Sequence, residues 1–372
     1  MEKLSLTLSH NILSRLPLFS LFNCKLVCKS WYNLVKHPNL PFLHHDFHES
    51  HNSPSLILHS PHSHGGDQLF FVDNFNYVDR DDNHHQSYKG VAKEIVLPDE
   101  LDDHKFTSVL HCDGFLCLSY MEVENLSTYN KFWVYNLFTG ELMRLPPKPM
   151  TPEYKVVSGF GYHPKYKARK VVRIVEHECV KYDSKLGNCE LSLEQTTEVF
   201  SLGTLSWRDK GKNPFRIRMQ SCQVLINGAL HWFGQDKVKK YSQNIIVSFD
   251  LMLEEFGRIS LPDIRIDETE EDDSMLTVLG GCLSVISRMP DNKIDVWLMK
   301  DYGMKESWTK EFTIDPEFHL LGFLRPLWVL SNGEILAEYG KQALFSYHRN
   351  SKKIKKMNVR NLPRPFQVAP SI

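Results

Sequence analysis

Histidines are concentrated in one short part of this 372-residue chain, and histidine is a common ligand of zinc. Seven of the 18 fall between positions 44 and 64. His44 and His48 could share one helix face, a spacing that suits a metal, and Asp46 and Glu49 stand nearby. No cysteine or carboxylate cluster completes a tetrahedral set. A solvated histidine-rich segment is the favoured interpretation, and a zinc site is the alternative. The seven are His44, His45, His48, His51, His59, His62 and His64.

The eight cysteines are scattered, mostly in apolar surroundings, which predicts free thiols in a reducing compartment rather than a disulfide framework. His111 and Cys112 are adjacent, but neighbours in a strand point to opposite faces and cannot form a nucleophile–base pair. Gly159 and Gly161 form only a fragment of a phosphate loop, and a turn is the preferred explanation. We therefore expect no catalytic residue, no cofactor and no metal.

His231-Trp232 invites a site interpretation, because both side chains occur in many binding pockets. The pair stands at a position that recurs along the chain. A structural role is preferred, with the histidine fixing a hairpin between two strands.

The first 45 residues have helical periodicity. Leu8, Ile12, Leu13 and Leu16 recur at spacings of three and four, and Pro17 is expected to end this helix. A second helical segment follows, with Ser20 as its predicted N-cap. Apolar residues continue at spacings of three and four as far as His37-Pro38, namely Leu21, Cys24, Val27, Cys28, Trp31, Leu34 and Val35.

More apolar residues are present than one helix face can hold. Leu18, Phe19, Phe22 and Leu26 lie off that face. A unit of about 40 residues rarely folds alone, and exposed apolar surface of this kind marks a protein–protein contact. Two interpretations stay open: the helices dock an external partner, or they cap the rest of the chain.

Residues 4–45 resemble an F-box, the module that docks a substrate receptor onto the Skp adaptor of a cullin-RING ubiquitin ligase. The resemblance implies a three-helix unit whose adaptor-binding residues are Leu4, Ile12, Leu13, Leu16, Pro17, Leu21, Val27, Cys28 and Trp31. The matching pieces are Ile12 to Pro17, Ser20-Leu21, Val27 to Trp31, Leu34 and Pro38. Family members usually begin with Leu-Pro, and here the pair is Leu4-Ser5. A proline at that place would fix the first turn of the helix, and its loss is expected to weaken adaptor binding a little.

From about residue 55 the pattern changes to short strands rich in β-branched and aromatic residues, separated by turn signals. Gly114, Gly228, Gly281 and Gly333 occupy equivalent turn positions, and the last three are 53 and 52 residues apart. The first interval is 114, which corresponds to two repeats, one of them degenerate near Gly159. An aromatic residue before a later turn repeats at Tyr135, Phe200, Phe249, Trp297 and Tyr347, and Phe71 is a candidate first member.

A period near 50 residues is typical of propeller blades, each a four-stranded sheet. Residues 55–372 leave room for about six blades, and a pair of stacked β-sandwiches is the alternative. The same region resembles the F-box-associated domain of plant F-box proteins, a propeller-like domain that recognises substrates. The matching pieces are Asn227 to Trp232, Ser248 to Leu251, Ile259 to Pro262, Val296 to Gly303 and Glu306 to Thr309.

The expected organisation is therefore a mainly β chain with a small α domain at its N-terminus. Residues 1–45 form the helical adaptor-binding domain, residues 46–66 a histidine-rich linker or first strand, and residues 67–372 the propeller-like domain. A net charge of -1 gives no indication of nucleic-acid binding, which usually requires a basic surface. No apolar run approaches the length of a membrane helix. Without a recognisable signal peptide, cytoplasm and/or nucleus is the expected location.

Two charged runs have competing explanations. The acidic run 267–273 is expected to be a solvated loop, or a surface that recognises a basic segment. Residues 349–356, RNSKKIKK, are interpreted as a lysine-rich edge hairpin that resists aggregation, with a nuclear address as the alternative.

The resemblances imply a non-catalytic substrate receptor. It would bind the Skp adaptor, through it cullin and RING subunits, and also an unidentified target protein. A propeller enzyme or lectin with a helical cap, and a scaffold that binds the adaptor without ubiquitination, are the other hypotheses.

Overall fold

A computed structural model gives the fold, and the chain divides by internal contacts into two compact units. One unit comprises Met1–Leu116, Val134–Met143 and Ile314–Ser371, and the other Cys117–Trp133 and Arg144–Thr313, with Ile372. The structure describes residues 5–16, 18–37, 40–41, 43–44, 55–62, 64–78, 87–124, 127–147, 155–166, 168–183, 188–219, 221, 223–236, 243–264, 274–289, 291–315, 324–330 and 332–369.

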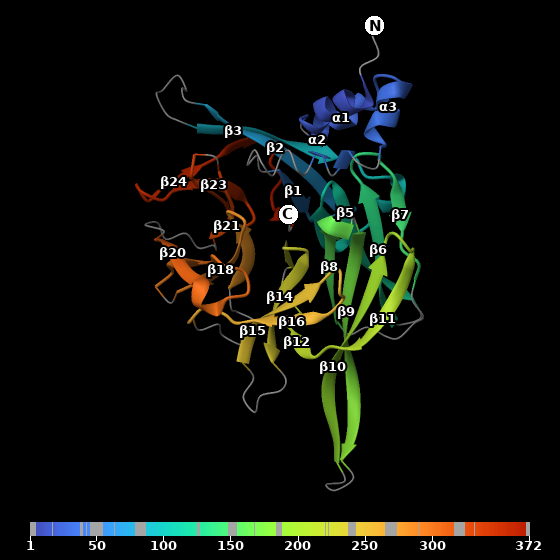
Figure 1. The fold of residues 1–372 in the computed structure, drawn as a ribbon, viewed down its shortest axis with the longest axis vertical. Helices are drawn as coiled ribbons and strands as arrows, with labels where there is room; N and C mark the ends of the chain where they lie inside the picture. Colours follow the sequence, from blue (N-terminus) through green and yellow to red (C-terminus); the bar gives the residue numbers. More distant parts are fainter. Residues whose placement is uncertain are drawn as a thin grey trace. The chain divides into compact units, whose positions relative to one another are not determined.

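The N-terminal part of the first unit is helical (Figure 1). Its helices are α1 (Leu6–Ser14), α2 (Leu18–Cys24) and α3 (Lys29–Val35), and residues 40–41 and 43–44 are also helical. The apolar residues after Pro17 lie on two helices and not on one face, because the chain turns between α2 and α3. The amide of Leu26 donates to the carbonyl of Asn23 (3.0 Å), and Cys28 is fully extended at φ -167°.

Ser20 was wrongly predicted as a helix cap, since it lies inside α2. The break after α2 allows each short helix to turn its own apolar residues inward. Leu21 and Cys24 are buried on α2, and Val35 is buried on α3.

The remainder of the described chain is almost entirely β, as predicted, and forms six sheets. Three 3-10 turns interrupt the strands: η1 (Asp99–Leu101), η2 (Pro164–Tyr166) and η3 (Lys305–Ser307). In four of these sheets, four consecutive strands pair in the order in which they follow the chain. Two of the four are β4 (Phe106–Cys112), β5 (Phe115–Glu124), β6 (Ser127–Asn136) and β7 (Leu142–Arg144), and then β8 (Lys155–His163), β9 (Ala168–Asp183), β10 (Asn188–Ser201) and β11 (Ser206–Lys212). The other two are β17 (Met275–Leu279), β18 (Cys282–Arg288), β19 (Ile294–Met299) and β20 (Trp308–Ile314), and then β21 (Leu324–Val329), β22 (Ile335–Tyr339), β23 (Ala343–His348) and β24 (Lys353–Lys356).

In a fifth sheet the first strand is split in two. It contains β12 (Phe215–Ile217), β13 (Val224–Ile226), β14 (Ala229–Asp236), β15 (Gln243–Asp250) and β16 (Phe256–Ile259), with both β12 and β13 paired to β14.

The sixth sheet joins early and late parts of the chain. It contains β1 (Leu56–Ser60), β2 (Gln68–Val78), β3 (Ser87–Ile95), β25 (Asn358–Arg360) and β26 (Gln367–Val368), in the order β25-β3-β2-β1-β26. Leu58 lies opposite Val368, and both belong to an apolar core with Leu336 and Phe366. Burial of that core ties the C-terminal strand to β1, which lies within the 46–66 segment.

The repeating turns have the backbone that the glycines predicted. Gly114, Gly228, Gly281 and Gly333 all have φ between 72° and 80°, and each follows the first strand of its sheet. Such positive φ values strain residues that carry a Cβ, which explains why glycine recurs at this position.

The aromatic repeat also has a structural basis. Tyr135, Phe200, Phe249, Trp297 and Tyr347 each occupy the third strand of a sheet. Phe71 fits the series, because β2 is third when its sheet is counted from β26. The 50-residue period is therefore the length of one four-stranded unit.

Gly159 and Gly161 were wrongly predicted as a turn, since both lie inside β8. A Cβ at Gly159 would come within 2.7 Å of Leu230 and of Trp232, and one at Gly161 within 2.7 Å of Leu251. These glycines let β8 approach the next sheet closely.

Strands β9 and β10 continue well beyond their neighbours (Figure 1). They pair from Ser201↔Lys170 to Asn188↔Asp183, whereas β8 pairs with β9 only as far as Glu176. Residues 177–183 and 188–195 thus form a two-stranded extension of the sheet.

Candidate functional site

The helical segment separates its apolar residues into two groups. One group is buried and holds the helices together: Leu13, Leu21, Cys24, Val35 and Leu40. The other group is exposed to solvent: Leu6, Leu8, Ile12, Leu26, Val27, Trp31, Tyr32 and Leu43. Exposed apolar side chains gathered on one short segment are typical of a protein-binding surface.

The predicted adaptor-binding residues fall on both sides of this division. Ile12, Val27, Cys28 and Trp31 are exposed, so the structure leaves them accessible. Leu16 is half-buried. Leu13 and Leu21 are only 2% and 0% exposed, so they belong to the core and not to a contact surface. Leu4 and Pro17 lie outside the described residues.

The turn between α2 and α3 presents the most exposed part of this group. Leu26 is 85% exposed and Val27 63% exposed. Periodicity identified both as apolar but placed Val27 on a continuous helix face. Leu6, Tyr32 and Leu43 were missed as surface residues, and a break in the helix was the signal that could have found Leu26.

Ser5 starts α1 through a side-chain hydrogen bond, whereas the family's usual proline would fix the backbone of the first turn. The Ser5 backbone is extended, at φ -60° and ψ 150°, and its hydroxyl oxygen accepts a hydrogen bond from the amide of Leu8 (3.2 Å). Its carbonyl also accepts the amide of Ser9 (3.0 Å). This is an N-cap, and it satisfies the Leu8 amide, to which a proline side chain offers no acceptor. Ser5 therefore supports the helix start without a proline, and its effect on adaptor binding stays a prediction.

Polar contacts attach the helices to the hairpin of β6 and β7. Lys36 at the end of α3 donates to a carboxylate oxygen of Glu141 (2.7 Å), and this hydrogen bond is the main cause of a lowered Glu141 pKa. The His44 ring packs edge-on against Phe138, with 5.5 Å between centroids, and its Nε2 lies 3.0 Å from the carbonyl oxygen of Leu16. These contacts hold one side of the helical segment and leave the exposed group described above free.

Helices α1 and α3 also meet through two histidines. The rings of His10 and His37 are 4.5 Å apart, and His10 is buried. Burial, followed by the neighbouring His37, lowers the pKa of His10. The buried His10 ring is therefore a packing element between the helices.

The residues considered for metal binding or catalysis have other environments. Among the described residues, no group of three or more His, Cys, Asp or Glu could hold a metal ion. His59 lies 2.7 Å from Asp67, and His62 contacts the carbonyl of His64. His45, His48, His51 and the acidic run 267–273 lie outside the described residues.

Two buried thiols have a pKa shifted in the direction opposite to that of a cysteine nucleophile. Burial raises the pKa of Cys117 and of Cys24. The side chain of His111 accepts the amide of Gly114 (3.2 Å), within the first turn of its sheet.

His231 is fully buried and bridges two elements. Its Nδ1 lies 3.3 Å from the carbonyl oxygen of Val224 on the paired strand β13, so Nδ1 carries the proton. Nε2 is then an acceptor, and the Tyr302 hydroxyl donates to it (2.7 Å). Burial lowers the pKa of His231 to about 4. The histidine fixes the β13–β14 hairpin and also holds the loop after β19.

The segment 349–356 folds as a hairpin whose second strand, β24, lies at the edge of its sheet. Lys352, Lys353, Lys355 and Lys356 are exposed there. Among the helices of the described residues, none is long and apolar enough to cross a membrane.

Comparison with known proteins assigns both parts of the chain. The F-box domain family matches residues 1–43, and the F-box associated beta propeller domain family matches residues 68–361. F-box protein At3g07870 of Arabidopsis thaliana is 30% identical, over 98% of this chain and 90% of its own. F-box protein CPR1 of the same plant is 26% identical, over 98% and 87%. F-box/kelch-repeat protein At3g23880, also from Arabidopsis thaliana, is 26% identical over 91% and 86%.

Helices with exposed apolar residues, followed by six β-sheets of which four follow the chain in the same simple order, are thus the two domains of a known type of protein. The chain belongs to the F-box proteins that carry an F-box associated beta propeller domain.

Proposed function

We propose that this protein is the substrate-recognition subunit of a Skp–cullin–F-box ubiquitin ligase. The F-box would bind a Skp-family adaptor, and through it the cullin and RING subunits. The propeller domain would bind a target protein. The protein itself would carry out no chemical step.

The observation that carries the proposal is the exposed apolar group on the F-box helices. Ile12, Val27 and Trp31 are 43%, 63% and 39% exposed, although similar residues in the same segment are fully buried. Burying such side chains in a partner is favourable by about 25 cal/mol for each Å² of apolar surface removed from water. The F-box family match supports a Skp-type adaptor as that partner.

The ligase would act by proximity. Holding a target lysine beside a ubiquitin-charged conjugating enzyme converts a bimolecular transfer into an effectively unimolecular one. The propeller domain then needs to bind its target and to be rigid, and it needs no nucleophile of its own. The raised pKa of the Cys24 and Cys117 thiols is compatible with this role.

The direct test is capture of the adaptor by the tagged full chain. The double variant Val27→Asp/Trp31→Ala should lose most adaptor binding, because it places a charge and a cavity in the contact. Val96→Asp is the matched control, since Val96 is 83% exposed in the same compact unit but outside the F-box. Wild-type recovery by the double variant would refute the proposed adaptor site.

A second measurement separates a ubiquitin ligase from a scaffold. Reconstituted with adaptor, cullin, RING and a conjugating enzyme, the wild type should support ubiquitin transfer to a bound target, and the double variant should not. Adaptor binding with no transfer to any target would favour the scaffold.

We also propose the cytoplasm, the nucleus or both as its location. Cys24, Cys28, Cys112 and Cys117 are free thiols, as expected in a reducing compartment. Imaging of a fluorescent fusion checks this, and accumulation in the secretory pathway would contradict it.

A further inference from the structure

The C-terminal segment carries a charge that the rest of the chain does not. Between Gly340 and Ile372 there is no aspartate or glutamate. The basic residues there are Lys341, Arg349, Lys352, Lys353, Lys355, Lys356, Arg360 and Arg364. These eight leave 36 Lys and Arg against 45 Asp and Glu elsewhere, a net charge of -9 outside a segment of +8. The segment therefore has a net charge of +8 in a protein that is nearly neutral as a whole.

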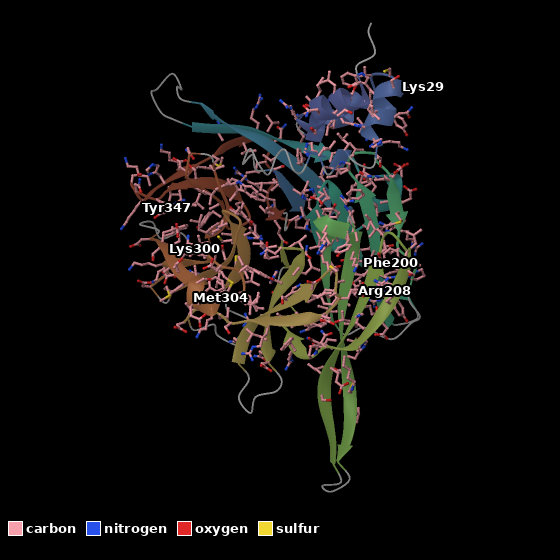
Figure 2. The ribbon with its side chains drawn as sticks, in the orientation of Figure 1. Lys29, Phe200, Arg208, Lys300, Met304 and Tyr347 are labelled. Carbon is pink, nitrogen blue, oxygen red and sulfur yellow. The ribbon has the colours of Figure 1, made fainter. Side chains whose placement is uncertain are left out.

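The structure places the densest part of this charge on an open strand. Strand β24 pairs with β23 on one side, with Lys353 opposite His348 and Lys356 opposite Phe345. It is the last strand of its sheet, so among the described strands none pairs with its other edge. Figure 1 shows β24 next to β23, and Figure 2 labels Tyr347 on β23.

The lysines of this strand are not neutralised. Lys352, Lys353, Lys355 and Lys356 are exposed, and within the described part of the chain none of them has a carboxylate partner. Other exposed lysines are paired, as Lys300 is with Glu311 (2.7 Å). Protection of an edge against aggregation requires only a few charges and does not explain the absence of acidic residues over this whole segment.

We propose that β24 is a docking edge for an extended acidic segment of the target protein. The backbone of that segment would pair with the open edge of β24, as in other complexes formed by strand addition. Its carboxylates would meet Lys353 and Lys355 on one face and Lys356 on the other, because successive side chains of a strand alternate. The inference rests on the proposed function only in assigning the segment to a ubiquitination target.

An acidic peptide fits better than nucleic acid or an anionic membrane. Strand pairing uses the backbone of the partner, which neither of those can supply. A nuclear address would have to leave the sheet to be bound as an extended chain, whereas Ile354 in this strand is held opposite the buried Tyr347.

The test uses the full chain and a labelled eight-residue peptide of alternating glutamate and valine, followed by fluorescence anisotropy. Replacement of Lys352, Lys353, Lys355 and Lys356 by Gln should weaken binding at least about tenfold. The matched control replaces Lys212, Lys293, Lys300 and Lys305 by Gln, which removes the same charge from lysines that have carboxylate partners. The control variant should bind the peptide as tightly as wild type does. An equal loss of peptide affinity in both variants would overturn the proposal that the peptide binds at β24.

Two further arms use the wild-type protein, so they do not depend on the variants folding. A peptide N-methylated on alternate residues should bind more weakly if backbone pairing contributes, and higher salt should weaken binding of the unmodified peptide. Equal binding of the methylated peptide would overturn strand addition. Binding of duplex DNA or phosphatidylserine vesicles with none of the peptide would overturn the choice of partner.

Failure of this inference is distinguishable from failure of the proposed function. Adaptor capture is measured on the F-box, and peptide binding is measured without adaptor. Loss of adaptor capture with retained peptide binding would reject the ligase role and keep the acidic-segment site. The reverse result would keep the ligase role and reject the site.

Discussion

Protonation of His231 should make the propeller domain less stable in mild acid. The ring is fully buried, donates to the carbonyl of Val224 and accepts the hydroxyl of Tyr302. Burial, the largest cause, holds its pKa at about 4, against about 6.5 for an exposed histidine. Between these two values the unfolded chain binds a proton that the folded chain does not.

The sign and size of the effect follow from linkage. Above about pH 6.5 the histidine is neutral in both states and contributes no pH dependence. As the pH falls toward 4, the unfolded state is stabilised by up to about 3 kcal/mol, since one pKa unit corresponds to about 1.4 kcal/mol. From pH 7.5 to pH 5.5 the expected loss is about 1.3 kcal/mol.

The assay compares urea unfolding of wild type and of His231→Gln at pH 7.5, 6.5 and 5.5, followed by tryptophan fluorescence. Glutamine can still donate and accept but does not titrate, so the two free energies of unfolding should converge by about 1.3 kcal/mol at pH 5.5. Carboxylates titrate equally in both proteins and cancel in the difference. His348→Gln removes another histidine, from the β23–β24 turn, and controls for the loss of any imidazole. Parallel curves for wild type and His231→Gln would refute the reasoning.

Three further substitutions test packing and capping. Ser5→Ala should cost about 1 kcal/mol in stability of the F-box, and Ser5→Thr should restore it, as measured by thermal unfolding of the helical signal. Gly159→Ala should destabilise the propeller domain by about 1–3 kcal/mol, because a Cβ would clash with Leu230, and an unchanged urea midpoint would contradict the close approach of β8. Trp308→Phe should cost about 1 kcal/mol, since the indole N–H donates to the carbonyl of Ser260 (2.8 Å), and comparison with wild type by urea unfolding checks this.

The sequence predicted features whose cause is local. An asparagine or aspartate before glycine specifies a turn with positive φ, so Gly114 and Gly228 located the first hairpin of two sheets. The aromatic residues of the third strands recur because most sheets bury this position: Tyr135, Phe200, Phe249 and Tyr347 are buried, and Trp297 is half-buried. Both patterns depend on neighbouring residues in the chain, which is why the period of one sheet could be counted.

Features whose cause is distant in sequence were not predictable in the same way. Gly159 is a glycine because Leu230 and Trp232, some 70 positions later, press against it. Its surroundings in the sequence contain only a second glycine, which resembles a turn. The same limit applies to His231 on β14, whose partner Tyr302 lies in the loop between β19 and η3, 71 positions later.

Periodicity predicts which residues of the F-box are apolar, but it does not predict which of them are buried and which are exposed. Spacings of three and four identify Ile12 and Leu13 as equally apolar, yet one is 43% exposed and the other 2%. The turn after α2 decides the difference for Val27, because it ends the helix before that residue can face inward. Separate buried and exposed groups allow stability and binding to change independently. A substitution at Leu13 should unfold the helices, whereas one at Val27 should leave them folded and remove only the partner.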